Sequence, residues 1–201
     1  IAALENEESV ILASIISATG STPASVHSKM LVTDGGAKSL GTIGGGCMEG
    51  DVIVQASRMY NSCKGKILKF ELNEDDIEGG LICGGNLEIL IEPVRRKDIP
   101  IIRQLQAALD DGIDCLLVTL LAQDGTVALK KIVTKESESA KEIFSALPEL
   151  SSELNALLQM AERKQETKTL TLPSGTLIVE PLQGRPDLII FGGGHVSKFL
   201  S

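Results

Sequence analysis

Short apolar runs, separated by turn-forming residues, divide the chain into strands and helices. Runs of about four to eight residues that alternate or stay apolar are typical of strands, and apolar residues three and four apart are typical of helices. The pattern predicts helices over residues 48–60, 101–109 and about 138–166, the last of which is broken at Pro148. It predicts strands over residues 10–17, 29–33, 40–43, 66–72, 86–94, 115–121, 127–134, 167–172 and 176–181.

The second half of the chain repeats the pattern of the first, since each half reads strand, strand, helix, strand, strand. VILASIISATG (10–20) aligns with CLLVTLLAQDG, KMLVT with KKIVT, and LEILIEPV with GTLIVEPL. Helices that alternate with groups of strands favour an α/β fold class. We therefore predict a mixed-sheet α/β unit over residues 1–185, built of two related half-lobes at about 1–95 and 96–185.

The first half carries three glycine-rich loops that the second half lacks, namely GSTP (20–23), GTIGGGC (41–47) and DDIEGGLICGG (75–85). Loops mounted on a rigid frame are where binding and catalytic residues concentrate. We therefore expect the function of the chain to reside in these three segments.

Three consecutive glycines, Gly44, Gly45 and Gly46, lead to Cys47 at the start of a predicted helix. Such a turn presents unpaired backbone N–H groups and the positive end of the helix dipole, which bind anions and stabilise a thiolate. These residues therefore predict a bound anion, phosphate above all, or a reactive sulfur. The alternative is a tight turn with a buried, unreactive cysteine.

Cys83 lies in a similar setting, followed by Gly84 and Gly85 and preceded by an acidic segment. Two cysteines beside glycines, each in a loop that the other half lacks, predict one shared site. We expect their sulfur atoms within about 12 Å of each other, the reach of one small cofactor in a pocket. Cys63 lies in a polar turn and Cys115 begins an apolar strand, so both are interpreted as incidental.

Four polar side chains near these loops can be interpreted in more than one way. The Ser21 and Thr22 hydroxyls suit a ligand phosphate, but they also suit a turn cap. Glu49 suits a general base near Cys47, but a glutamate in the first turn of a helix commonly balances the helix dipole. His27 lies in a loop and is expected to be solvated.

Charge and composition exclude several classes of function. A formal net charge of −8 and 2% aromatic residues argue against nucleic-acid binding, which needs basic side chains and stacking platforms. The four cysteines form no C-x-x-C pair, so the sequence matches neither a zinc ribbon nor a disulfide-rich scaffold. No apolar run approaches the roughly 18 residues of a membrane span, and the acidic N-terminal segment is unlike a signal peptide. We expect a cytoplasmic protein with reduced thiols.

The C-terminal segment, residues 186–201, begins with an apolar strand that runs into GGGHVS. Gly192, Gly194 and Ser197 occupy the three small positions of the dinucleotide-binding fingerprint. We therefore predict the start of a Rossmann-type domain, incomplete here, whose full-length form is a candidate for NAD(P) binding. The segment lacks the second strand and its acidic residue, so we expect this chain alone not to bind NAD(P).

Together these motifs make the chain resemble the xanthine dehydrogenase accessory factor family, also called the XdhC/CoxI family. The resemblance rests on GSTP, KMLVTDGG, GTIGGGCMEG, LICGGNLEILIEP and VEPL…PDLIIFGGGHVS, in that order. It spans most of residues 10–94 and again 176–198. The chain departs from the family where Ala24 follows Pro23, because the family usually has an arginine there.

The resemblance implies a maturation chaperone rather than a catalyst. Such a protein binds the molybdenum cofactor (molybdopterin), protects it while its terminal sulfur is installed, and hands it to a xanthine dehydrogenase-like molybdenum hydroxylase. Cys47 would then contact the metal, with Cys83 as a second sulfur, and residues 44–46 would hold the phosphate. A cysteine desulfurase and a second copy of the chain are further candidate partners.

Two other functions remain open. One is an oxidoreductase that uses NAD(P) bound by a complete Rossmann-type domain. The other is a scaffold that docks the hydroxylase and whose cysteines are structural. Pterin fluorescence and the molybdenum content of the full-length protein would separate the three.

Overall fold

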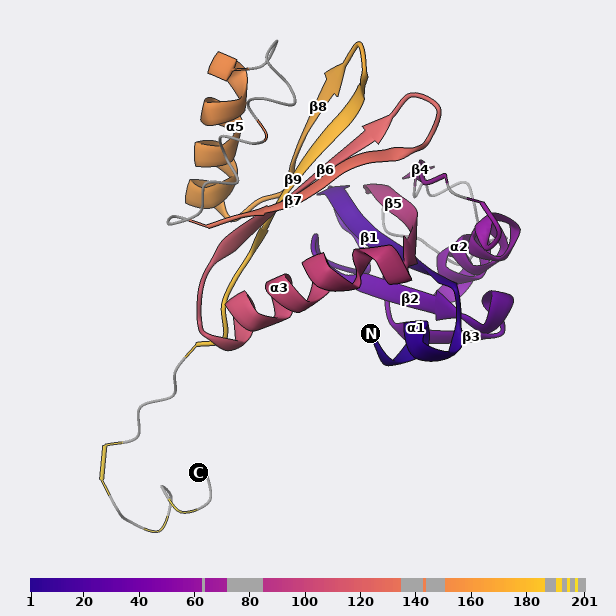
Figure 1. Cartoon of the computed structure of the whole chain (residues 1–201), viewed down its shortest axis with the longest axis horizontal. Helices are drawn as coiled ribbons and strands as arrows, with labels where there is room; N and C mark the ends of the chain where they lie inside the picture. Colours follow the sequence, from indigo (N-terminus) through magenta and orange to yellow (C-terminus); the bar gives the residue numbers. More distant parts are fainter. Residues whose placement is uncertain are drawn as a thin grey trace.

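The computed structural model describes residues 1–62, 64–71, 85–134, 143, 151–186, 191–192, 195 and 198 of the chain. The described strands form two sheets, one from each half of the chain (Figure 1). The predicted α/β fold class is confirmed. All pairings between the described strands are antiparallel. We predicted a sheet with both parallel and antiparallel pairs, and for the described strands that prediction is wrong.

The first half contains α1 (Ala2–Asn6), β1 (Ser9–Thr19), β2 (Lys29–Thr33), β3 (Lys38–Gly41), α2 (Gly46–Met59), β4 (Lys66–Glu71) and β5 (Asn86–Arg95). The second contains α3 (Ile99–Asp110), β6 (Cys115–Ala122), β7 (Val127–Val133), α5 (Ser151–Lys164), β8 (Lys168–Leu172) and β9 (Gly175–Leu182). Short 3-10 turns, η1 (Asp34–Gly36) and η3 (Arg96–Asp98), follow β2 and β5.

The two sheets share one strand order. Without its edge strand β3, the first sheet reads β2-β1-β5-β4, and the second reads β7-β6-β9-β8. Helix α2 precedes β4 in the first half, and α5 precedes β8 in the second. The internal repeat suggested by the sequence is therefore matched by the topology, while the boundaries of the half-lobes stay a prediction.

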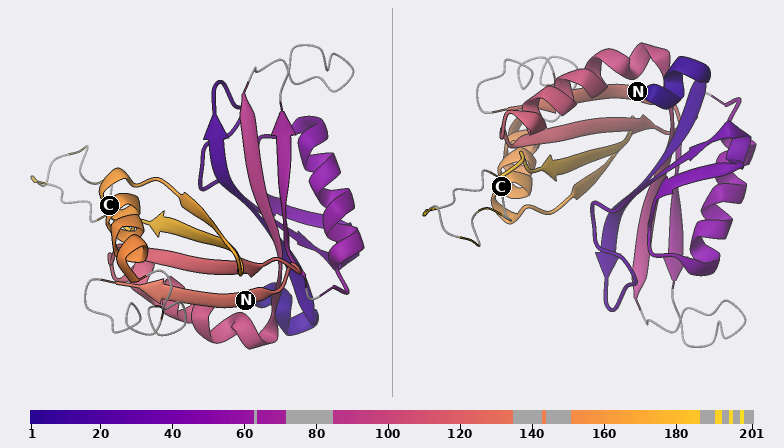
Figure 2. Two further views of the ribbon diagram at one scale, coloured as in Figure 1. Left: turned by 90° about the horizontal axis from the view of Figure 1, so that it is seen from above. Right: turned by 90° about the horizontal axis from the view of Figure 1, so that it is seen from below.

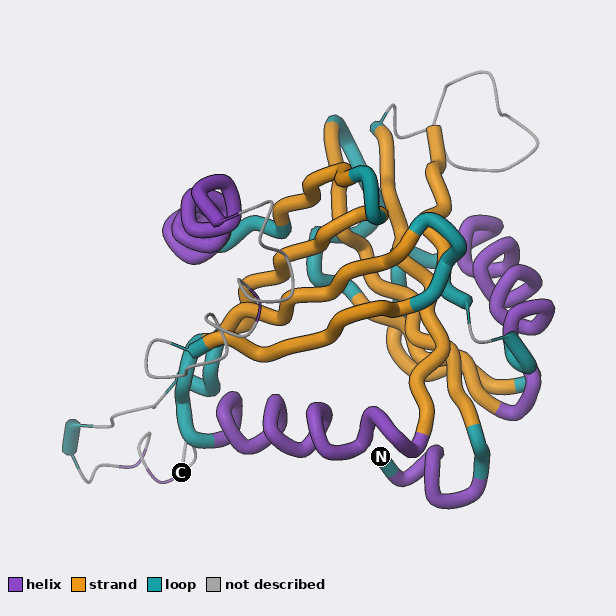
Figure 3. Tube along the Cα trace, turned by 45° about the horizontal axis from the view of Figure 1, so that its top comes forward, coloured by secondary structure: helices purple, strands orange, loops and turns teal. Residues whose placement is uncertain are grey.

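The sheets pack face to face between two outer helices (Figure 2). Helix α2 covers the outer face of the first sheet, where Val52 joins the core that contains Ile11 and Ile89. Helix α5 covers the outer face of the second sheet, where Leu158 packs in the core with Val179. Helix α3 connects the end of β5 to the start of β6 and runs below both sheets (Figure 3).

Alternation along the strands explains these layers, because successive strand side chains point to opposite faces. In β1, Ile11 and Ala13 belong to the core under α2, whereas Ile16 belongs to a separate cluster between the sheets. That cluster contains Ile16, Leu90, Leu121 and Ile178. Burial of apolar side chains from both halves therefore holds the two sheets together.

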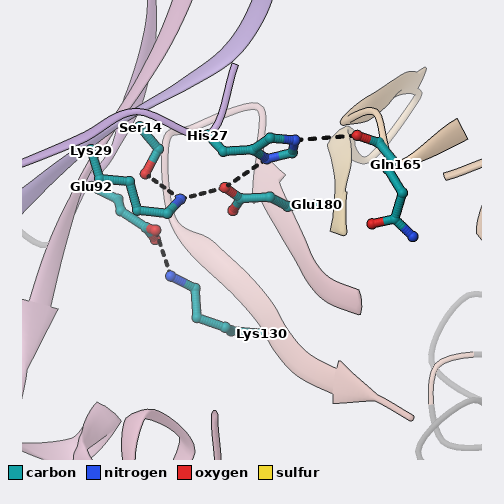
Figure 4. Close-up of polar contacts among 7 residues, drawn as sticks. All are labelled: Ser14, His27, Lys29, Glu92, Lys130, Gln165 and Glu180. Atoms are coloured by element: carbon teal, nitrogen blue, oxygen red, sulfur yellow. Dashed lines mark hydrogen bonds and ion pairs between the residues drawn. The ribbon is translucent and has the colours of Figure 1, made fainter. Parts of the chain in front are cut away.

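Two ion pairs, each of a half-buried lysine and a buried glutamate, cross between the sheets (Figure 4). Lys29 of β2 pairs with Glu180 of β9, and the Lys130 Nζ of β7 lies 2.5 Å from the Glu92 Oε1 of β5. The two glutamates are buried, and Lys29 also donates to the Ser14 hydroxyl at 3.1 Å. Each sheet thus supplies one lysine and one glutamate to the other.

The two ion pairs occupy equivalent positions in the two halves. Lys29 lies opposite Ser14 of β1, and Lys130 lies opposite Thr119 of β6. The glutamates are likewise equivalent in the alignment of LEILIEPV with GTLIVEPL. Contacts that repeat with the partners exchanged are the mark of a two-fold relation. The repeat therefore extends from strand order to individual charged side chains.

Several predicted elements are present with shifted ends. The strand predicted over 40–43 is β3 at 38–41, because Gly41 has a φ of +87°, outside the extended region. Helix α2 begins at Gly46 and not at residue 48. Of the helix predicted over 138–166, α5 covers 151–164, and most of residues 138–150 lie outside the described part of the chain.

One predicted side-chain environment is wrong. His27, expected to be solvated, is half-buried between the two halves of the chain, with Nδ1 3.9 Å from the Glu180 carboxylate. Its Nε2 lies 3.4 Å from the main-chain oxygen of Gln165. His27 has a φ of +80°, so its loop turns sharply to bring the ring to this position.

The predicted start of a Rossmann-type domain lies largely outside the described residues. Gly192 is described, whereas Gly194 and Ser197 are not. The dinucleotide-binding fingerprint therefore stays a prediction.

We expect Lys130→Met to lower the free energy of unfolding by about 3–5 kcal/mol, because it leaves the Glu92 carboxylate buried without its cation. Adding Glu92→Leu should recover most of that loss, since apolar replacements of a whole buried pair are often neutral. Urea unfolding of both single variants and the double variant measures the coupling. Purely additive losses would contradict an ion pair between the sheets.

The Glu180 carboxylate should make the fold sensitive to acid. Burial alone would raise its pKa, but the contact with His27 and the charge of Lys29 outweigh burial and hold the pKa below its ordinary value of 4.5. A carboxylate with a lowered pKa stabilises the fold fully above the unfolded value, and this stabilisation is lost as pH falls through the folded value. The double variant Lys29→Met/Glu180→Leu should therefore lose less free energy of unfolding than the wild type between about pH 6 and about pH 3.

The matched control is Glu166→Gln, which removes an exposed carboxylate paired with Lys168. Exposed pairs contribute little to stability, so this variant should keep the acid sensitivity of the wild type. Denaturant titrations at each pH make the comparison. If the double variant followed the wild-type pH dependence, the pair would not be the acid-sensitive element.

Candidate functional site

The glycine loop, residues 41–47, starts tightly packed against β2. The Thr42 N–H donates to the Lys29 carbonyl at 3.1 Å, and a Cβ on Gly41 would lie 2.4 Å from the same oxygen. Both this close approach and the positive φ of Gly41 require a glycine. Lys29 therefore holds the loop with its main chain while its side chain pairs with Glu180.

Three residues in left-handed conformations follow. Gly44, Gly45 and Gly46 have φ angles of +120°, +78° and +69°, which residues with a side chain rarely adopt. This run turns the chain into α2 and places Cys47 in the first helical turn. The Cys47 side chain is exposed, so it is not the buried cysteine of the alternative interpretation. Cys115 is buried, and burial raises the pKa of its thiol.

The Glu49 carboxylate folds back over the glycine loop. Its Oε1 accepts hydrogen bonds from the Thr42 hydroxyl at 2.5 Å, the Ile43 N–H at 3.0 Å and the Gly45 N–H at 2.9 Å. The bond from Thr42 is the main cause that holds the pKa of Glu49 below its ordinary value, and the two amides add to it against burial. The Gly44 N–H donates to the Thr42 hydroxyl at 3.2 Å. The amides of residues 43–45 therefore already have partners, and the anion among them belongs to the chain itself.

The GSTP loop lies between the glycine loop and Gly85. A Cβ on Gly44 would lie 2.9 Å from Pro23 Cγ, and a Cβ on Gly85 would lie 2.4 Å from the Ser21 carbonyl. The Thr22 hydroxyl donates to the Ala24 carbonyl at 2.9 Å, as a turn cap does. The GSTP loop therefore lies against the glycine loop on one side and against Gly85, the last glycine of the DDIEGGLICGG segment, on the other.

Two of the predicted site residues, Cys83 and Gly84, lie outside the described part of the chain, as does the incidental Cys63. The shared site of Cys47 and Cys83 therefore stays a prediction. Among the described residues, no three His, Cys, Asp or Glu side chains gather closely enough to hold a metal ion. A metal contact at Cys47 thus stays a prediction as well.

The charged residues between the sheets were not predicted from the sequence. Lys29 and Lys130 each begin or interrupt an apolar strand, and both glutamates precede a proline in the repeated EP motif. A charged residue at the same place in both halves of a repeat was the available signal. It could have been found by comparing the aligned halves for polar residues as well as apolar ones.

Part of the first half of the chain is similar to a known protein family. Residues 3–71 match the XdhC and CoxI family. This segment includes the GSTP loop, the glycine loop and Cys47. The resemblance to the XdhC and CoxI family is confirmed. The match does not extend to the second half.

A curated relative covers nearly the whole chain. It is a probable xanthine dehydrogenase subunit from Bacillus subtilis (strain 168), 26% identical over 199 residues. The alignment covers 96% of this chain and 55% of the relative, so the chain spans about half the length of that relative.

The fold also has a solved counterpart. A crystal structure of a xanthine dehydrogenase from Bacillus halodurans superimposes with a TM-score of 0.58 at 23% identity. The superposition covers 68% of this chain and 41% of that one, and it supports the fold. In the part of our chain that the structure describes, no helix is both long and apolar enough to cross a membrane.

Two neighbouring glycines provide a matched test of the loop packing. A Cβ on Gly44 would meet Pro23, Met48 and Ala24 within 3.3 Å, whereas one on Gly45 would meet nothing within 4 Å. Both have positive φ, so Gly45→Ala should cost only the conformational penalty of about 1–2 kcal/mol. Gly44→Ala should lower the melting temperature clearly more. Equal losses in thermal unfolding would contradict the packing of the glycine loop on the GSTP loop.

Proposed function

We propose that the chain belongs to an accessory factor that binds the molybdenum cofactor and serves a xanthine dehydrogenase-like molybdenum hydroxylase. The observation that carries the proposal is the exposed Cys47 in the first turn of α2, after three left-handed glycines. The family match over residues 3–71 and the xanthine dehydrogenase names of the relatives support it.

The donor chemistry of the loop fits the metal part of this cofactor. Cys47 offers an exposed sulfur, and molybdenum is a metal that soft sulfur ligands suit. The space beside Gly45 is open, since a Cβ there would meet nothing within 4 Å. A bulky group can therefore approach the backbone next to Cys47.

For the phosphate part of the cofactor, two of the predicted contacts differ in their present hydrogen bonds. The amides of Ile43 and Gly45 donate to Glu49, so a phosphate on those amides would have to displace a carboxylate. The neighbouring Ser21 is exposed and lies next to Gly85. We therefore assign the phosphate contact to the Ser21 hydroxyl and the metal contact to Cys47, while the Thr22 hydroxyl stays bonded to the Ala24 carbonyl.

When bound, the cofactor would supply the molybdenum that accepts a terminal sulfur, and the chain would hold it through Cys47. We propose that the hydroxylase receives the loaded cofactor and that a cysteine desulfurase supplies the sulfur. The α2 face with the glycine loop is the side that meets both partners, because Cys47 is exposed there.

Replacing Cys47 with serine should test the assignment, because serine keeps the size and removes the soft ligand. In the full-length protein purified with cofactor, we expect Cys47→Ser to retain less than about a tenth of the wild-type molybdenum, while the cofactor-free forms of both proteins melt at the same temperature. Cys63→Ser, in the polar turn NSCKGK, is the matched control and should retain the wild-type amount. Pterin fluorescence and metal analysis give the measurement. Full retention by Cys47→Ser would remove Cys47 from the site.

A further inference from the structure

The space between the two sheets contains a cavity of about 250 Å³, here named the inter-sheet cavity. It is lined by side chains of α1, α3 and of strands from both sheets, among them Leu12, Leu31, Leu105 and Leu117. None of the residues of the glycine loop lines it. It is therefore separate from the site around Cys47.

The cavity explains an irregular burial pattern. Within residues 9–16 of β1, Leu12 alone is half-buried while its neighbours are buried. Leu117 of β6 is half-buried between buried neighbours in the same way. Helix α3 has apolar side chains at Ile102 and Leu105, yet none of its residues is fully buried. Apolar side chains of β1, β6 and α3 thus line the inter-sheet cavity without filling it.

Empty apolar space costs stability, because the lining side chains lose dispersion contacts and remain incompletely removed from water. Apolar cavities of about 150 Å³ lined by leucine, isoleucine and phenylalanine bind benzene. The inter-sheet cavity is larger, so it has room for a bicyclic ring.

Most of the polar part of the wall is formed by the crossed ion pairs, and Asp98 adds a carboxylate whose Oδ2 accepts from the Arg95 N–H at 2.9 Å. Lys29, Glu180, Lys130 and Glu92 all line the cavity, together with Ser14 (Figure 4). The two lysines and two glutamates neutralise each other, so an added charge would find no excess of opposite charge among them. An ammonium has three N–H donors and a carboxylate about four acceptor positions, which leaves these groups able to bond one ligand polar group besides each other.

We infer that the inter-sheet cavity is a binding site for a small, uncharged, mainly apolar molecule with one hydrogen-bonding group. Its apolar body lies against leucines of both sheets and α3, and its polar group bonds at the ion pairs. Pockets with apolar walls and a few convergent polar groups are typical of small-molecule sites. Because both halves line the cavity, a bound molecule stabilises their association.

Indole and benzene are suitable probes, since indole adds one N–H donor to an apolar bicyclic ring. We expect indole at millimolar concentration to raise the melting temperature of the full-length protein by a few degrees and to bind at least tenfold more tightly than benzene. Isothermal titration and a crystal soaked with indole measure affinity and place. Binding of neither probe, or electron density for indole elsewhere, would overturn the inference.

A cavity-filling variant separates binding from general hydrophobic adsorption. Leu105→Phe adds volume to a half-buried side chain that lines the cavity, so it should raise the melting temperature without indole and weaken indole binding at least tenfold. Leu129→Phe adds the same volume to a half-buried leucine packed in the core under α5, and should bind indole like the wild type. If Leu105→Phe does not fold, Ile101→Phe fills the same cavity. Equal indole affinity in the filled and control variants would overturn the inference.

Discussion

The fold depends on one constraint. Four charged side chains lie between the two sheets, and each is paired with a side chain of opposite charge from the other sheet. Glu180 and Glu92 are 5% and 3% exposed, so a carboxylate without its lysine would be a buried, uncompensated charge. The apolar cluster between the sheets is non-directional and would tolerate other packing angles. The crossed pairs with Lys29 and Lys130 add a directional requirement, because each joins one residue of the first sheet to one residue of the second.

Lys29 links this interface to the candidate site. Its side chain reaches Glu180 of the second sheet, and its carbonyl accepts from Thr42 at the start of the glycine loop. Thr42 in turn donates to Glu49, which bonds the amides of the loop. A short series of contacts therefore connects the second half to the loop that carries Cys47. The sequence of the second half has no comparable glycine loop. Through Glu180, the second half contributes to the interface that positions β2.

Local patterns in the sequence were enough to predict much of this arrangement. The glycines before Cys47 predicted a turn into a helix, because no other residue accepts three positive φ angles in succession. The alignment of the halves predicted a repeat that the strand order matches. The aligned halves mark these four charged residues, but which lysine pairs with which glutamate could not be predicted, since Lys29 and Glu180 are 151 residues apart and meet only when the sheets pack. The direction of the Glu49 side chain was equally undetermined, because capping and catalysis require the same residue at the same position.

The self-bonded glycine loop has a consequence for selectivity. Glu49 is tethered three residues from Gly46, so it competes for the loop amides at an effective concentration that a free ion in solution rarely reaches. Free phosphate at ordinary cellular concentrations therefore competes poorly with Glu49 for these amides. A ligand that binds a second group nearby gains the same advantage of tethering and can compete. The tethered carboxylate thus disfavours the binding of isolated anions at these amides.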